Sequence, residues 1–278
     1  MIAFREASAG DREGITALRA RCFPEEEIEK EFPLARTFIA EAEGRPVAHL
    51  GFVEQTFVIG GEPYAGALAV DAMTDPAYRR QGVFQQLGAF ARDAVREDYA
   101  LSSAWQIRPA VLPAMMANGW IPLLRAPIFV RFLLPGSEAV GGGAPAGTRD
   151  IRSAREAFLG GFAHARLPKW RFDASGYVTT GRLVTRRTLL RGHDSLCIVE
   201  VTPDARQELR DALHHARARG IGLAAALLSW RHPSVPLLLR MGFVPSQHRF
   251  RFLVNVFDSR IDVRHAKWAL SWADTDHL

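Results

Sequence analysis

Two arginines and one glycine lie close together in a segment that could bind a phosphate. The segment comprises Arg79, Arg80, Gln81, Gly82, Val83 and Phe84. A glycine lets backbone N–H groups approach a ligand closely. At the start of a helix those N–H groups and the helix dipole attract anions. The alternative is an ordinary turn with two solvated arginines, and the residue types alone support both readings.

The surrounding pattern predicts the elements that would position this segment. Residues 67–73 are apolar apart from Asp71 and predict a buried strand. Asp75-Pro76 ends that strand, because proline fixes its own φ and keeps the preceding residue extended. Apolar residues then recur at helical spacing from Val83 to Val95. Strand, short loop and helix in this order favour the phosphate-binding interpretation.

The rest of the first half alternates short strands and helices. We expect strands over 2–7, 37–42, 46–59, 64–73, 100–107, 121–124 and 128–134. We expect helices over 11–22, 24–32, 83–96 and 109–118, the last followed by Gly119-Trp120. Residues 135–149 are rich in Gly, Pro and Ala, which predicts a linker.

The second half repeats the end of the first. Helices are expected over 151–165, 203–219 and 233–240, with strands over 196–201, 223–230 and 247–257. Residues 239–243, which end in Gly242-Phe243, parallel residues 116–120. This order predicts a divergent internal repeat. The repeat's loop, residues 201–206, contains no glycine, so we expect it to have lost phosphate binding.

The segment Arg79-x-x-Gly82-x-Phe84, after Asp75-Pro76-x-Tyr78, resembles the acyl-CoA pyrophosphate loop of the GNAT superfamily of N-acetyltransferases. That loop is usually Gln/Arg-x-x-Gly-x-Gly/Ala, so Phe84 is a departure. The element order over the first 134 residues is also similar to that of the family. The resemblance implies an α/β (α+β) fold with two tandem GNAT-like domains of the bacterial tandem type, each a mixed, mostly antiparallel sheet flanked by helices. Residues 1–134 would bind acyl-CoA, and residues 150–278 would form a degenerate copy with a C-terminal tail.

The resemblance also implies acetyl-CoA as co-substrate and a set of binding residues. Arg79, Arg80 and the N–H groups of Gln81, Gly82, Val83 and Phe84 would hold the pyrophosphate. The pantetheine arm would pair like an added strand with Ala72, Met73 and Thr74. The N–H near Ala72 would stabilise the oxyanion, an effect of roughly 3–4 kcal/mol per donor.

Two acids are candidates for the catalytic step. Asp71 would act as base or hold the ammonium group of the acceptor, unless it makes a structural hydrogen bond in the sheet. Glu54, on the neighbouring strand, is the second candidate. Met115 stands where a tyrosine that protonates the thiolate is common in the family. Water or another residue would then replace that tyrosine, or the chain binds acyl-CoA without turnover.

Composition narrows the class of protein. The net charge is +5, but the arginines are interspersed, so nucleic-acid binding is not expected. With no long apolar run, no apolar N-terminal leader and only two cysteines, we expect a cytoplasmic protein with no membrane span and no metal site.

The sequence therefore predicts an N-acetyltransferase for a primary amine on a small or peptide-like acceptor. An aminoglycoside-type acetyltransferase and a non-catalytic acyl-CoA sensor or assembly protein are the alternatives. A homodimer is possible through an exposed aromatic stretch at 268–272.

Overall fold

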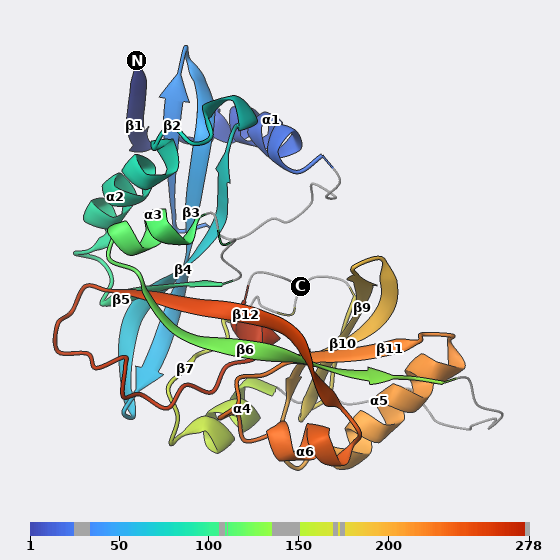
Figure 1. The fold of residues 1–278 in the computed structure, drawn as a ribbon. Coiled ribbons are helices and arrows are strands. Elements are labelled where there is room, and N and C mark those ends of the chain that lie inside the picture. Colours follow the sequence, from blue (N-terminus) through green and yellow to red (C-terminus); the bar gives the residue numbers. More distant parts are fainter. Residues whose placement is uncertain are drawn as a thin grey trace. The chain divides into compact units, whose positions relative to one another are not determined.

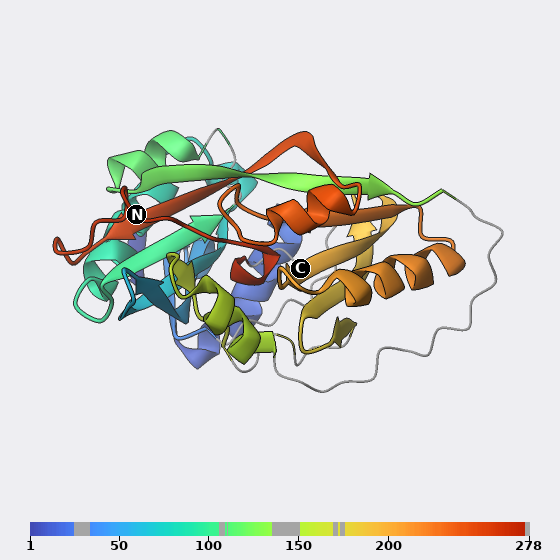
Figure 2. The ribbon, with the colours of Figure 1, turned by 90° about the horizontal axis from the view of Figure 1, so that it is seen from below.

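The computed structural model describes residues 1–24, 34–105, 109, 111–134, 151–168, 172 and 176–275 (Figures 1 and 2). Within them the fold is α+β, with one mixed sheet of twelve strands and flanking helices. The strand order is β1-β2-β3-β4-β5-β12-β6-β11-β10-β9-β8, and β7 pairs with β3. The expectation of a separate sheet for each domain is therefore not met.

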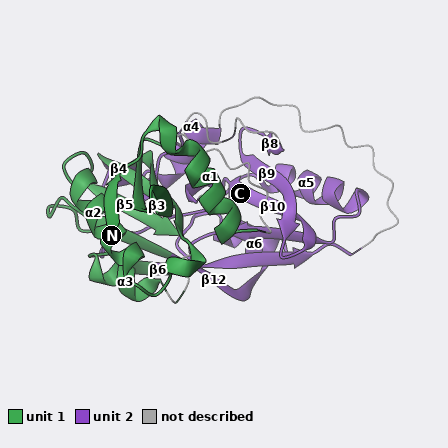
Figure 3. Ribbon diagram, turned by 90° about the horizontal axis from the view of Figure 1, so that it is seen from above, with its two compact units in different colours: residues 1–56, 64–123, 252–262 green, residues 57–63, 124–251, 263–278 purple. Residues whose placement is uncertain are grey.

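The described chain forms two compact units (Figure 3). Unit 1 contains residues 1–56, 64–123 and 252–262, and unit 2 contains residues 57–63, 124–251 and 263–278. The expected acidic helix at 25–32 and the linker at 135–149 lie outside the described residues. The domain boundaries 1–134 and 150–278 stay predictions.

Unit 1 is built on five strands and the end of a sixth. These are β1 (Ile2–Glu6), β2 (Arg36–Ala42), β3 (Arg45–Ile59), β4 (Glu62–Thr74), β5 (Leu101–Trp105) and residues 252–256 of β12 (Val244–Val256). β5 runs parallel to β4, and β12 runs antiparallel to β5. Helix α2 (Val83–Val95) connects β4 to β5. Its buried residues recur every four positions, at Val83, Leu87, Ala91 and Val95, and pack on a core that includes Phe38 and Ala40.

Unit 2 has the same local plan. Its strands are β7 (His164–Ala165), β8 (Tyr177–Thr179), β9 (Leu183–Leu190), β10 (His193–Val201), β11 (Leu223–Leu227), residues 124–132 of β6 (Ile121–Phe132) and residues 244–251 of β12. β10 and β11 are parallel and joined by α5 (Arg206–Ala218), as β4 and β5 are joined by α2. The strand antiparallel to β11 is β6, although it follows unit 1's helices in the chain. In each unit, the strand that pairs antiparallel with β5 or β11 thus comes from the other half of the sequence.

The helix before each final strand ends in the same way. Helix α3 (Leu112–Ala117) is followed by Gly119 at φ 87°, and α6 (Val235–Arg240) by Gly242 at φ 79°. The next residue returns its N–H to the helix, from Trp120 to the Met115 carbonyl and from Phe243 to the Leu238 carbonyl. A left-handed residue at this position favours glycine. The structure therefore contains the expected internal repeat.

Two expected elements differ from the structure. The strands expected at 121–124 and 128–134 form one strand, β6, which runs through Pro122 and Pro127. Both prolines precede residues 128–132, which make the ladder with β11, so neither has to donate there. The helix expected to reach residue 165 is α4 (Ile151–Leu159), which ends before Gly160-Gly161.

The aromatic stretch at 268–272 is not exposed. Trp268 and Trp272 are 3% and 1% exposed, and Trp268 makes an edge contact with Phe57 within unit 2. Ser271 donates to the buried Glu200 carboxylate (2.8 Å). This stretch gives no reason to expect a homodimer, and the homodimer stays a prediction. Among the described residues, no helix has the length and hydropathy needed to cross a membrane.

Candidate functional site

The loop between β4 and α2 is held by the turn that precedes it. Pro76–Tyr78 forms a short 3₁₀ turn, and the Asp75 carboxylate accepts from the Ala77 N–H (3.0 Å) and from Arg21 Nε (2.8 Å). Burial acts to raise the pKa of Asp75, but these two donors outweigh it and lower the pKa. An ionised Asp75 therefore fixes where the loop begins.

The loop itself presents backbone N–H groups. Gly82 is the N-cap of α2 at φ 76°, and Arg80 also has a positive φ, 63°. In the described part of the chain, residues 79–82 form a turn, and the N–H groups of residues 81–84 make no backbone hydrogen bond of standard length and angle. Arg79 Nε donates to the Thr74 carbonyl (3.1 Å), and the side chains of residues 79–81 are exposed. Exposed donors, two arginines and a helix N-terminus are the features of an anion-binding site, and we call residues 79–84 the cradle.

The cradle follows a free edge of β4. Among the described residues, the register of β4 with β5 covers only Gly66–Leu68 against Leu101–Ser103, although β5 continues to Trp105. Residues 69–74 of β4 therefore have no partner in the described part of β5. Ala72 is exposed, Met73 is buried and Thr74 is half-buried on this stretch. An unpaired strand edge of this kind can accept an extended amide-bearing chain.

Asp71 lies within this stretch, in a left-handed conformation with φ 54°. Its carboxylate forms an ion pair with Arg19 of helix α1 (Arg12–Cys22), and both side chains are nearly buried. Its backbone carbonyl accepts from Nδ1 of His49 on β3 (2.8 Å). Asp71 is therefore a paired anion rather than a free base. The sequence interpretation missed Arg19 and His49, since neither belongs to a local motif.

The structure does not place Glu54 near Asp71. It lies five residues beyond His49 on the same extended strand, which places it roughly 17 Å farther along β3. Its carboxylate is exposed, and its charge adds to burial in raising the pKa of Tyr99. The structure thus separates the two acids that the sequence offered as catalytic candidates.

Phe84 and Met115 both contribute to an apolar cluster. Phe84 packs against buried residues that include Met115, Trp120 and Leu253. The departure from the usual loop pattern therefore does not fill the cradle, because the ring contributes to the core. Met115 is 5% exposed and has no proton to donate, so this position supplies no acid.

The equivalent loop of unit 2 lacks a cradle. Helix α5 begins after Ala205, whose φ is −76°, and no residue in the loop 201–206 has a positive φ. The Asp204 carboxylate accepts from Thr202 Oγ1 (2.5 Å) and lies 3.4 Å from Arg182. A carboxylate beside this helix N-terminus disfavours a second anion.

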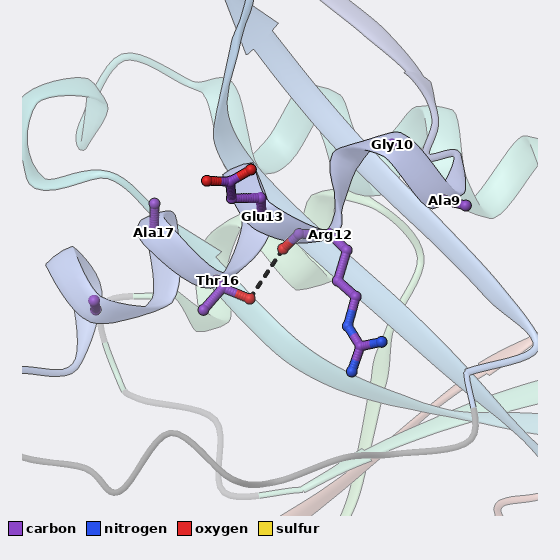
Figure 4. A pocket seen from close by; sticks show the side chains of 7 residues that line it. Ala9, Gly10, Arg12, Glu13, Thr16 and Ala17 are labelled. Atoms are coloured by element: carbon purple, nitrogen blue, oxygen red, sulfur yellow. Dashed lines mark hydrogen bonds between the residues drawn. The ribbon is translucent and has the colours of Figure 1, made fainter.

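A separate pocket of about 630 Å³ lies on α1 and the 3₁₀ turn Ala9–Asp11 (Figure 4). Its lining consists mainly of small side chains, with Arg12 and Glu13, and Thr16 Oγ1 donates to the Arg12 carbonyl (2.9 Å). It shares no residue with the cradle or with β4. Among the described residues, no group of three His, Cys, Asp or Glu could hold a metal ion.

Comparisons with known proteins agree with this geometry. Residues 3–112 match the family model described as an acetyltransferase (GNAT) domain. No curated protein matches the sequence. A GCN5-related N-acetyltransferase from Kribbella flavida has a TM-score of 0.64 at 15% identity, covering 93% of this chain and 73% of that chain.

Two further solved structures are similar over nearly the whole chain. A GCN5-related N-acetyltransferase from Anabaena variabilis has a TM-score of 0.64 at 10% identity, with 92% of this chain and 73% of that chain covered. Eis1 from Mycobacterium abscessus has a TM-score of 0.62 at 12% identity, with 93% and 74% covered. At these identities the likeness concerns the fold. Residues 3–112 are therefore similar to GNAT acetyltransferase domains, and the chain as a whole has a GNAT-like fold.

Proposed function

We propose that the chain is an acetyl-CoA-dependent N-acetyltransferase that transfers acetyl directly to a primary amine of a small or peptide-like acceptor. The observation that carries the proposal is the anion cradle around Gly82, placed directly after the free edge of β4. Unit 2 repeats the strands and helices but not the cradle. We therefore propose that each chain has one site that can bind acetyl-CoA.

Each part of the site has a task in this reaction. The N–H groups of residues 81–84, with Arg79 and Arg80, would hold the pyrophosphate of acetyl-CoA. Ala72, Met73 and Thr74 would pair with the pantetheine amides. The thioester carbonyl would then lie beside the Ala72 N–H, which would stabilise the oxyanion that forms as the amine attacks.

The proton balance involves the acceptor and the leaving thiolate. The amine must be neutral to attack, so its ammonium form first gives one proton to water. The nitrogen loses a second proton when the amide forms, and water carries this proton to the departing thiolate. Asp71, kept ionised by Arg19, would accept a hydrogen bond from this nitrogen and orient it. A thiol has an ordinary pKa of about 8.5, so the departing thiolate can take its proton from water. No side chain at position 115 is needed for that step.

A non-catalytic acyl-CoA sensor is the second candidate, favoured by the buried Met115. Thiol release separates the two functions. Purified protein is incubated with acetyl-CoA and a panel of amines that includes polyamines, aminoglycosides and N-terminal peptides. Amine-dependent release supports the transferase, whereas tight binding of acetyl-CoA without release supports the sensor.

Binding at the cradle is tested by Gly82→Glu. A carboxylate at this position would repel the pyrophosphate, and we expect acetyl-CoA affinity to fall at least about 100-fold, or about 2.7 kcal/mol. Gly44→Glu is the matched control, because Gly44 has a similar φ (72°), open space around it and no contact with the loop. Calorimetry in which both variants bind like the wild type would refute the assignment of the cradle.

A further inference from the structure

We propose that His49 is a positioning residue that aims the Ala72 N–H at the oxyanion of the transfer reaction. The inference rests on the proposed function and adds a residue to its site. His49 lies on β3 and belongs to no local sequence motif around the loop. Its place in the reaction follows from one hydrogen bond and the geometry of one peptide group.

The hydrogen bond fixes which way that peptide group points. A carbonyl oxygen can only accept, so His49 Nδ1 carries the proton in the 2.8 Å contact with the Asp71 carbonyl. The carbonyl of Asp71 and the N–H of Ala72 belong to the same planar trans peptide group and point in opposite directions. The Ala72 N–H therefore points away from His49. On β4 it lies within the stretch that has no partner in the described part of β5.

The conformation of Asp71 explains why this peptide group needs support. A φ of 54° inside a strand is typical of a bulge, which removes a peptide group from the regular ladder. Aspartate tolerates this conformation better than most residues, but at some cost in free energy. Two contacts hold it in place: Arg19 pairs with the carboxylate and His49 binds the carbonyl.

The surroundings of His49 keep it in the form that the contact needs. The ring is 1% exposed, and burial, with a smaller effect of the Arg19 charge, lowers its pKa to about 4. His49 is therefore neutral at pH 7, with a proton on Nδ1 and a lone pair on Nε2. Among the described residues no partner binds Nε2. The ring donates one hydrogen bond, and that bond goes to the peptide group in question.

Two substitutions of His49 distinguish the effect of its hydrogen bond from the effect of its packing in the core. In His49→Asn the side-chain amide nitrogen occupies nearly the place of Nδ1 and can donate to the Asp71 carbonyl. In His49→Leu the apolar volume is largely kept and the donor is lost. Removing an oxyanion donor costs about 100-fold or more in kcat, and a misdirected donor should approach that loss. We expect His49→Leu to lower kcat by roughly 10–100-fold with unchanged acetyl-CoA affinity.

Rescue by asparagine is the decisive comparison. We expect His49→Asn to recover most of the kcat lost in His49→Leu, while the KM for the amine stays similar in all three proteins. An unchanged kcat in His49→Leu would overturn the proposal. Equal losses in the two variants would also overturn it, since they would mean that the ring matters only for packing.

Nuclear magnetic resonance tests the same inference without turnover. ¹⁵N shifts of the wild-type imidazole should report the Nδ1–H tautomer, and a proton on Nε2 would refute it. The Ala72 amide resonance should move in His49→Leu and stay near its wild-type position in His49→Asn. If no amine releases thiol, the transferase function fails, while these measurements still show whether His49 orients the Ala72 peptide group. If His49→Leu does not fold, the tautomer and the activity of His49→Asn carry the test.

Discussion

Removal of Arg155 from the core of unit 2 should destabilise that unit strongly and in a pH-dependent way. The guanidinium of Arg155 is fully buried on α4 and donates to Glu200 (2.6 Å), to both oxygens of Asp274 (2.7 Å) and to the Ala165 carbonyl. Arg155→Met keeps the length of the side chain but leaves two buried carboxylates without their cation. Loss of one member of a buried ion pair typically costs about 3–5 kcal/mol.

The lowered pKa of Glu200 gives a second estimate of the stability that this ion pair contributes. Burial acts to raise this pKa, but Arg155, with smaller contributions from His232 and the Val201 N–H, outweighs it and lowers the pKa from 4.5 to about 2. That difference corresponds to about 3 kcal/mol of stability above pH 4.5. A carboxyl group with a lowered pKa loses this contribution as the pH falls from about 4.5 towards 2.

In Arg155→Met the pH dependence of stability should have the opposite sign. Without Arg155, burial would dominate and raise the pKa of Glu200 above its ordinary value. The folded variant would then bind a proton more readily than the unfolded chain. Its stability should rise as the pH falls from 7 towards 5, so the difference from the wild type should narrow over that range.

Urea unfolding followed by tryptophan fluorescence measures both effects. A loss of about 3 kcal/mol should lower the midpoint of unit 2 by about 1–2 M at pH 7. Arg187→Met is the matched control, because Arg187 makes an exposed pair with Asp194 in the same unit. Equal midpoints for the two variants, or a difference from the wild type that widens on acidification, would refute the reasoning.

Three further outcomes follow from the structure. Asp71→Asn should lower kcat/KM for the amine while calorimetry finds acetyl-CoA affinity unchanged, since the carboxylate is assigned to the acceptor; weaker cofactor binding would contradict this. A thiol reagent at pH 8 should label Cys22 but not the buried Cys197, whose pKa is raised by burial to about 12, and two reacting thiols in folded protein would contradict that burial. Gly88→Ala should cost about 1–2 kcal/mol, because a Cβ there would lie 2.6 Å from Asn118 Nδ2 and displace its bond to the Gln85 carbonyl. Adding Asn118→Ala should then cost little more in thermal unfolding, whereas fully additive losses would show that the two residues are not coupled.

Local features of the molecule could be read from the sequence because they depend on local chemistry. The strand, turn and helix around Gly82 follow from apolar spacing and from the backbone limits of proline and glycine. The Gly-aromatic pair after α3 and α6 marks the repeat for the same reason, since only a left-handed residue closes those helices in this way. Each of these features can be recognised from a few consecutive residues of the sequence.

Contacts between distant segments were decided by the tertiary structure. Arg19 and Asp71 are 52 residues apart, and nothing in either local sequence indicates the other. The same holds for His49, and for β12, whose last residues pair with β5 of unit 1. Trp268 and Trp272 are buried because the C-terminal segment is tied to Glu200 and Arg155 in the core of unit 2. Apolar periodicity sets which face of an element is buried, but the register of the sheet and the packing of helices choose the partner.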